Sequence, residues 1–75
     1  MYCPICGAIA DKIATAIDHM SIACSMCGEF DVESSVITSG QLQGLKPEER
    51  VVVLARAQRS AEPGSRPLIT PYLVA

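Results

Sequence analysis

The chain has little positive charge, and this bears on the partners that it can bind. Its 75 residues include six Lys and Arg against eight Asp and Glu, which gives a formal net charge of −2. Proteins that bind nucleic acid through its phosphate backbone usually present a strongly basic face. The composition therefore disfavours nucleic acid as a partner.

Long hydrophobic runs are also absent, although nearly half of the residues are apolar. A membrane-spanning helix needs about 20 consecutive apolar residues, and no segment reaches that length. No apolar segment follows a basic start, as it would in a secretory signal peptide. We therefore expect no membrane partner and a cytoplasmic protein, in which thiols stay reduced.

Aromatic residues are scarce, since the chain has no Trp, one Phe and two Tyr. A single domain of this length has a small core, whose burial roughly balances the entropy cost of ordering the chain. A structural metal would add about 10–16 kcal/mol to such a fold at neutral pH. We therefore expect a metal to decide whether the N-terminal half folds.

What the chain does have is four cysteines, in two C-x-x-C-G units with 17 residues between them from Cys6 to Cys24. Each unit can form a tight turn that directs two sulfurs toward one point. Its backbone amides can donate to the thiolates, and the glycine suits a positive φ. Two such turns predict a closed tetrahedral site for one structural Zn²⁺. The predicted metal ligands are Cys3, Cys6, Cys24 and Cys27.

Three other uses of the cysteines are less favoured: two disulfides, a redox-active dithiol and an iron site. Disulfides do not persist in a reducing cytosol, and no βαβ pattern surrounds either pair as in a thioredoxin-like motif. Four thiolates also accept iron in rubredoxin-like sites, but the second unit lacks a proline and the aromatics are few. Metal analysis would distinguish zinc from iron.

Residues 8–23 fit either a helix or two strands, and the metal site decides between them. The alanines favour a helix slightly, whereas the alternating apolar residues fit a hairpin that turns at Asp18 and His19. Cys6 and Cys24 must come close together to share a metal. We therefore expect the hairpin, because its two arms return the chain to its start.

Beyond the second cysteine unit, the pattern changes from strand to helix. Residues 29–33 alternate between apolar and acidic and predict a third strand. A short helix is expected next, with Ser34 or Ser35 as its N-cap. Its inward residues are predicted to be Val36, Ile37, Leu42 and Leu45.

Residues 47–61 carry the clearest helical pattern. Pro47 suits the first turn, glutamates follow it, and arginines lie toward the other end. On a helical wheel Val52 falls on the polar side and should be exposed. The inward arc is predicted to contain Val51, Val53, Leu54, Ala57 and Ala61.

The last segment, residues 68–75, is apolar and follows a turn-rich connector over 63–67. We expect this tail to be extended, and either to dock on the 47–61 helix or to pair with a partner. The helix and the tail together predict an interaction surface for a protein partner or a homodimer.

The two cysteine units together resemble a zinc ribbon over residues 2–33. The segment from Cys24 to Val32 carries most of the resemblance, because its turn runs directly into a strand. The resemblance implies that the aromatic residue of this strand covers the metal centre. Similar ribbons occur in a general transcription initiation factor, RNA polymerase subunits, ribosomal proteins and small bacterial and phage-related proteins. Ribbons that hold nucleic acid usually carry basic residues on the hairpin, where this chain has only Lys12.

These predictions combine into a small metal-stabilised α+β fold. Residues 1–33 are expected to form a zinc-ribbon hairpin with a third strand. Residues 34–75 are expected to add a short helix, a second helix and the extended tail, within one compact unit.

Other clusters of reactive residues are better explained by structure than by catalysis. His19 is interpreted as a solvated turn residue, because four thiolates already complete a metal shell. Asp11 and Asp18 are interpreted as a polar hairpin edge. His19, Ser21 and Ser25 lie close in sequence but lack an oxyanion site, and a closed metal site holds no catalytic water. We therefore predict no enzyme activity, no catalytic residues and no small-molecule substrate.

The arginines and methionines each have two interpretations. Met20 and Met26 are expected to pack near the metal, with an interaction surface as the alternative. Four arginines are expected to complement the helix dipole and to keep the protein soluble, with a phosphate-binding patch as the alternative. They are Arg50, Arg56, Arg59 and Arg66.

The leading function is a structural zinc protein that binds another protein. Nucleic-acid binding in transcription or translation and a thiol-based zinc or redox sensor are the alternatives.

Overall fold

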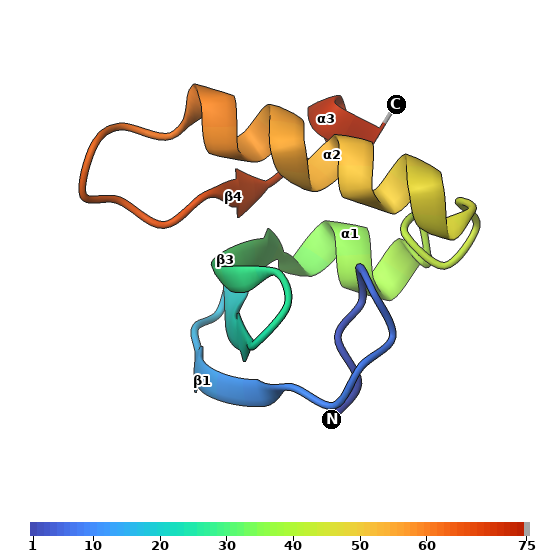
Figure 1. The fold of residues 1–75 in the computed structure, drawn as a ribbon, viewed down its shortest axis with the longest axis horizontal. Coiled ribbons are helices and arrows are strands. Elements are labelled where there is room, and N and C mark those ends of the chain that lie inside the picture. The colour runs from blue at the N-terminus through green and yellow to red at the C-terminus, as the bar shows by residue number, and fades with distance from the viewer. Residues whose placement is uncertain (75) are drawn as a thin grey trace.

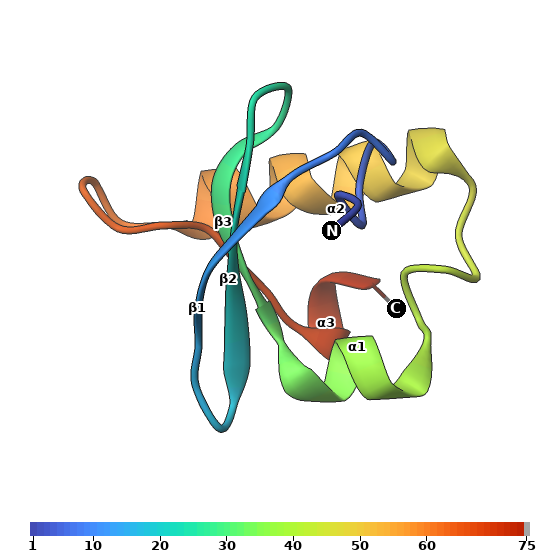
Figure 2. The same cartoon turned by 90° about the horizontal axis from the view of Figure 1, so that it is seen from below.

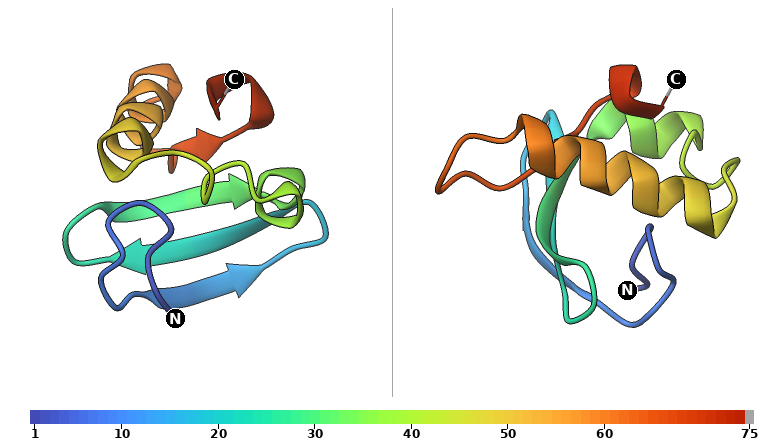
Figure 3. Two further views of the ribbon diagram at one scale, coloured as in Figure 1. Left: turned by 90° about the vertical axis from the view of Figure 1, so that its right-hand side faces the viewer. Right: turned by 45° about the horizontal axis from the view of Figure 1, so that its top comes forward.

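A computed structural model of the chain describes residues 1–74 and contains a four-stranded sheet in the order β1-β2-β3-β4. Strands β1 (Asp11–Thr15), β2 (His19–Cys24) and β3 (Gly28–Glu33) pair antiparallel. They lie side by side in Figure 3, and β4 (Leu68–Ile69) adds to β3 in parallel. The hairpin predicted from the cysteine spacing is therefore confirmed, and the helical alternative is wrong.

Three helices are described: α1 (Ser34–Ser39), α2 (Pro47–Ser60) and α3 (Pro71–Val74). In the view of Figure 2, α1 and α3 lie to one side of the first three strands, and α2 runs across behind them. The long α2 is followed by an exposed loop that carries the chain back to β4 (Figure 1). Within the described residues, no helix has the length and hydropathy of a membrane span.

The sheet has one apolar and one polar face, which follow from the alternation of side chains along its strands. Ile22 of β2 lies opposite Phe30 of β3, and both are fully buried. The neighbouring pair, Ser21 and Asp31, belongs to the other face. A bulge at Ile13 interrupts the pairing of β1 with β2. The predicted third strand is confirmed, with its start one residue earlier.

One buried cluster connects the two ends of the chain. It contains both strand and helix residues, so the cysteine-rich segment and the helical extension share a single core. Its members are Cys3, Ile5, Ala10, Ile22, Cys24, Phe30, Val32, Val36, Leu42, Val53, Leu54, Ala57 and Ile69.

The cap of the first helix differs from the sequence prediction. Glu33, rather than Ser34 or Ser35, occupies the N-cap position of α1. The Ser34 hydroxyl donates instead to the Ile17 carbonyl, and the Ser34 amide donates to the Asp18 carbonyl. Because β3 runs without a break into α1, Ser34 is used to tie the hairpin tip to the helix.

The second helix agrees with its prediction except on one residue. It ends at Ser60, one residue short of the predicted end, and Val53, Leu54 and Ala57 are buried as expected. Val52 is 46% exposed, also as expected, but Val51 is 54% exposed although the helical wheel puts it on the inward arc. Val51 lines an open groove between α2 and the cysteine turns instead of packing into the core.

The expected extended tail is wrong in part. Only Leu68 and Ile69 are extended, paired in parallel with Asp31 and Val32, and Pro71–Val74 is helical. Ile69 is completely buried, and Leu73 and Val74 pack against the same core. The tail is thus part of the fold of its own chain. Ala75 lies outside the described residues.

Candidate metal centre

Two backbone turns place the cysteines. In the first, the Cys3 amide donates to the Ala8 carbonyl at 2.7 Å, and the Gly7 amide donates to the Cys3 carbonyl at 2.9 Å. In the second, β2 ends at Cys24, which lies directly opposite Gly28 at the start of β3. Both glycines have positive φ, 78° at Gly7 and 83° at Gly28, as predicted from the C-x-x-C-G pattern.

The four predicted sulfurs converge. All four Sγ atoms lie within 4.8 Å of one another. The Cys3 and Cys27 sulfurs are 3.9 Å apart, and those of Cys6 and Cys24 are 3.5 Å apart. Sulfurs bound to one tetrahedral ion at about 2.3 Å would be about 3.8 Å apart. The cysteines are free thiols rather than disulfides, and their positions fit a single metal ion.

The pKa values of the cysteines are shifted in different directions within the two turns. Backbone amides of Cys27 and Met26 hydrogen-bond to the Cys24 sulfur and lower its pKa to about 7. Burial raises the pKa of Cys3, although amides of Cys6 and Ile5 donate to its sulfur and oppose the shift. Burial also raises the pKa of Cys27. Amide donors to the sulfur, predicted from the turn, are therefore present at the first cysteine of each pair.

Exposure distinguishes one cysteine from the other three. Cys3 and Cys24 are buried and Cys27 is half-buried, whereas Cys6 is exposed. Cys6 and Cys27 open onto a groove of about 330 Å³ between the cysteine turns and α2, which we call the knuckle groove. Its remaining lining residues are Ile5, Met26, Val51, Leu54, Ala55 and Gln58.

The methionines and the aromatic residue differ in burial. Met20 packs against the cluster that contains Cys3 and Cys24, in agreement with its expected place near the metal. Met26 also lies beside two cysteines, at the knuckle groove, but it is 78% exposed. Phe30 is fully buried in the cluster that also contains Cys3 and Cys24. The sequence carries no signal for the exposure of Met26, because its position depends on where α2 passes.

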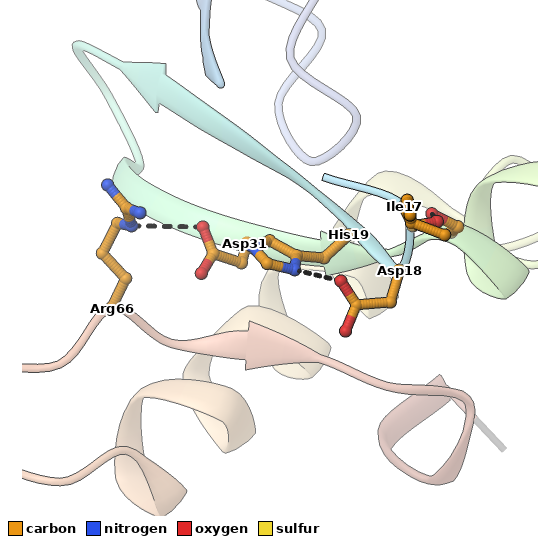
Figure 4. Close-up of polar contacts among 6 residues, drawn as sticks. Ile17, Asp18, His19, Asp31 and Arg66 are labelled. Atoms are coloured by element: carbon orange, nitrogen blue, oxygen red, sulfur yellow. Dashed lines mark hydrogen bonds and ion pairs between the residues drawn. The ribbon is translucent and has the colours of Figure 1, made fainter. Parts of the chain in front are cut away.

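The structure does not assemble the other candidate residues into a site. Asp11 begins β1 and Asp18 lies in the turn beyond its far end, so the two carboxylates are separated by the strand. His19 begins β2 and is half-buried rather than a solvated turn residue, and its Nδ1 lies 2.9 Å from Asp18 (Figure 4). That hydrogen bond lowers the pKa of Asp18. Ser21 is buried, whereas Ser25 is exposed.

Two of the four arginines are engaged by the fold. Arg50 donates to three backbone carbonyls of the loop before α2. Arg66 Nε lies 3.1 Å from Asp31 Oδ1 in an ion pair that is not aligned as a hydrogen bond (Figure 4). Arg56 and Arg59 are exposed on α2. Sequence reasoning missed the role of Arg50 in holding this loop, because its partners are backbone groups that carry no sequence signal.

Comparisons of the chain with protein-family models, with curated proteins and with solved structures find no match. The likeness to a zinc ribbon is therefore carried by the cysteine spacing and by the geometry of the four-sulfur cluster.

Proposed function

We propose that the chain is a small structural zinc protein with a zinc-ribbon-like site, and that it acts by binding another protein. The observation that carries the proposal is the convergence of four sulfurs from two separate turns within 4.8 Å. Four thiolates suit Zn²⁺ as a structural ion and leave no open position for a substrate or a catalytic water. The ion would join the first turn to the hairpin.

Elemental analysis of the purified full chain, prepared under reducing conditions, tests the metal. We expect one zinc per chain, and expect Cys24→Ser to lose it, because a thiolate ligand is removed. Ser25→Ala is the matched control, since Ser25 is exposed in the same turn and should leave the zinc in place. Iron instead of zinc, or no metal at all, would contradict the proposal.

The knuckle groove supports protein binding as the function of the scaffold. Met26 and Val51 are large apolar residues that stay exposed at this groove, and exposed apolar patches often mark interaction sites. The tail contributes less to such a surface than the sequence indicated, because Ile69 is buried. The groove and the exposed side of α2 therefore form the proposed surface.

The charges of the sheet favour protein over nucleic acid as the partner. Glu29, Asp31 and Glu33 follow one another on the polar face of β3. Arg66 compensates only part of this acidic face. A low-salt titration with labelled DNA and RNA separates the two functions. Binding that disappears in an Arg56→Ala, Arg59→Ala double variant would favour the nucleic-acid alternative.

Light scattering over a range of concentrations tests association of the chain with itself. If the knuckle groove is a self-association surface, the mass should rise with concentration, and Val51→Glu should abolish the rise. Val52→Glu is the matched control, because Val52 is similarly exposed on the same helix but does not line the groove.

A further inference from the structure

We propose that Cys6 is an oxidation site, at which a hydroperoxide starts the conversion of the metal centre into a Cys6–Cys24 disulfide. The inference rests on the proposed zinc site and deepens it. It assigns to one of the four ligands a reactivity that the other three lack.

The first argument is access. Cys6 is the exposed member of the cluster, and the other three cysteines are buried or half-buried. It also borders the knuckle groove, through which a small neutral oxidant reaches the sulfur without unfolding the chain. Oxidation of cysteine follows thiolate character and exposure. Metal binding keeps all four sulfurs as thiolates, so exposure becomes the property that separates them.

The second argument is the partner for a disulfide. The Cys24 sulfur lies 3.5 Å from that of Cys6, closer than the 3.9 Å between Cys3 and Cys27. A disulfide between Cys6 and Cys24 joins the first turn to the hairpin, as the metal would. Closure needs a shift of about 1.5 Å from that separation to the bonded S–S distance.

The chemistry balances with hydrogen peroxide as the oxidant. The Cys6 thiolate attacks one oxygen, the O–O bond breaks, and a sulfenic acid forms at Cys6 as hydroxide leaves. The Cys24 thiolate then attacks the Cys6 sulfur, the disulfide forms and a second hydroxide leaves. The two sulfurs lose two electrons, the peroxide gains them, and two protons convert the hydroxides to water. A metal that loses two of its four ligands is released.

Peptide mapping tests the order of events on the zinc-loaded full chain. The protein is exposed briefly to hydrogen peroxide with dimedone, which traps sulfenic acids, and a second sample is oxidised without dimedone and then alkylated. Tryptic cleavage after Lys12 and after Arg50 separates the two cysteine turns. We expect the first dimedone adduct on Cys6, and in the second sample a cross-linked species that joins peptides 1–12 and 13–50 through Cys24.

A matched pair of variants tests the role of the groove. Val51→Phe should fill space beside Cys6 and slow zinc release by peroxide several-fold, measured with a chromogenic zinc indicator. Val52→Phe should leave the rate unchanged, because Val52 faces a different part of the surface. The zinc content and circular dichroism of each variant show whether it is folded, and the mapping of the unmodified protein needs no variant.

The outcomes separate this inference from the zinc proposal. If the reduced protein holds one zinc but the first adduct is on another cysteine, or the disulfides form only within each turn, the oxidation proposal is overturned and the zinc site stands. If the reduced protein holds no metal, both proposals are overturned.

Discussion

At the scale of single residues, the glycines that end the cysteine turns are required by the backbone rather than by lack of space. Gly28 has a φ of 83°, and a Cβ added there would meet no heavy atom within 4 Å. Gly28→Ala should therefore cost only left-handed strain, roughly 1–2 kcal/mol of unfolding free energy. Gly44 lacks a positive φ, and Gly44→Ala should be neutral or stabilise by about 0.4–1 kcal/mol. Urea unfolding of the zinc-loaded variants measures both, and equal stabilities would contradict the argument.

Arg50 shows how one side chain can order a loop. Its Nε donates to the carbonyls of Leu42 at 2.8 Å and Leu45 at 3.1 Å, and its Nη2 donates to that of Gln43 at 3.2 Å. Arg50→Ala removes all three hydrogen bonds and should lower the unfolding free energy by about 1–3 kcal/mol. Arg56→Ala, at an exposed position of the same helix, should change it by less than about 0.5 kcal/mol. Similar losses in the two variants would mean that the three hydrogen bonds contribute little.

At the scale of elements, the two-residue strand β4 contributes more to the fold than its length suggests. Ile69 is completely buried, whereas its neighbour Leu68 is 42% exposed. Ile69→Ala should lower the unfolding free energy by about 2–5 kcal/mol, through lost burial and the cavity that remains. Leu68→Ala is the control and should cost much less. Thermal unfolding of the zinc-loaded variants compares them, and equal effects would mean that the tail is not anchored by Ile69.

The elements also show which parts of the fold the sequence could predict. The hairpin followed from a distance constraint, because Cys6 and Cys24 had to meet, and this overruled a slight helical propensity over residues 8–23. The second helix followed from the spacing of its apolar residues and from the proline, glutamates and arginines near its ends. The course of the tail could not be predicted, because pairing with β3 depends on a long-range contact that leaves no local pattern. The short helix α3 directly follows β4, so its position depends on the same long-range contact.

The residues of the metal site could be predicted from the sequence, but their exposure to solvent could not. The four cysteines and the amide donors follow from the two C-x-x-C-G turns, whose geometry is local. The unequal exposure of the four cysteines could not be predicted, because it depends on how α2 packs beside the turns, which is a long-range contact. Cys6 is therefore distinguished from Cys27 only by tertiary packing.

At the scale of the whole molecule, metal removal should unfold the entire chain rather than its first half alone. The cluster that contains Cys3 and Cys24 also contains Val53 of α2 and Ile69 of β4, so the two halves have no separate cores. A structural zinc site contributes about 10–16 kcal/mol, comparable to the total stability of about 5–15 kcal/mol of a typical domain. Adding a chelator to the ¹⁵N-labelled protein should therefore collapse the amide dispersion of α2 and β4 together with that of the hairpin. Returning zinc under reducing conditions should restore every signal, which excludes aggregation as the cause. Native amide signals from α2 and β4 in the metal-free protein would show that the helical extension folds alone, contrary to the shared core.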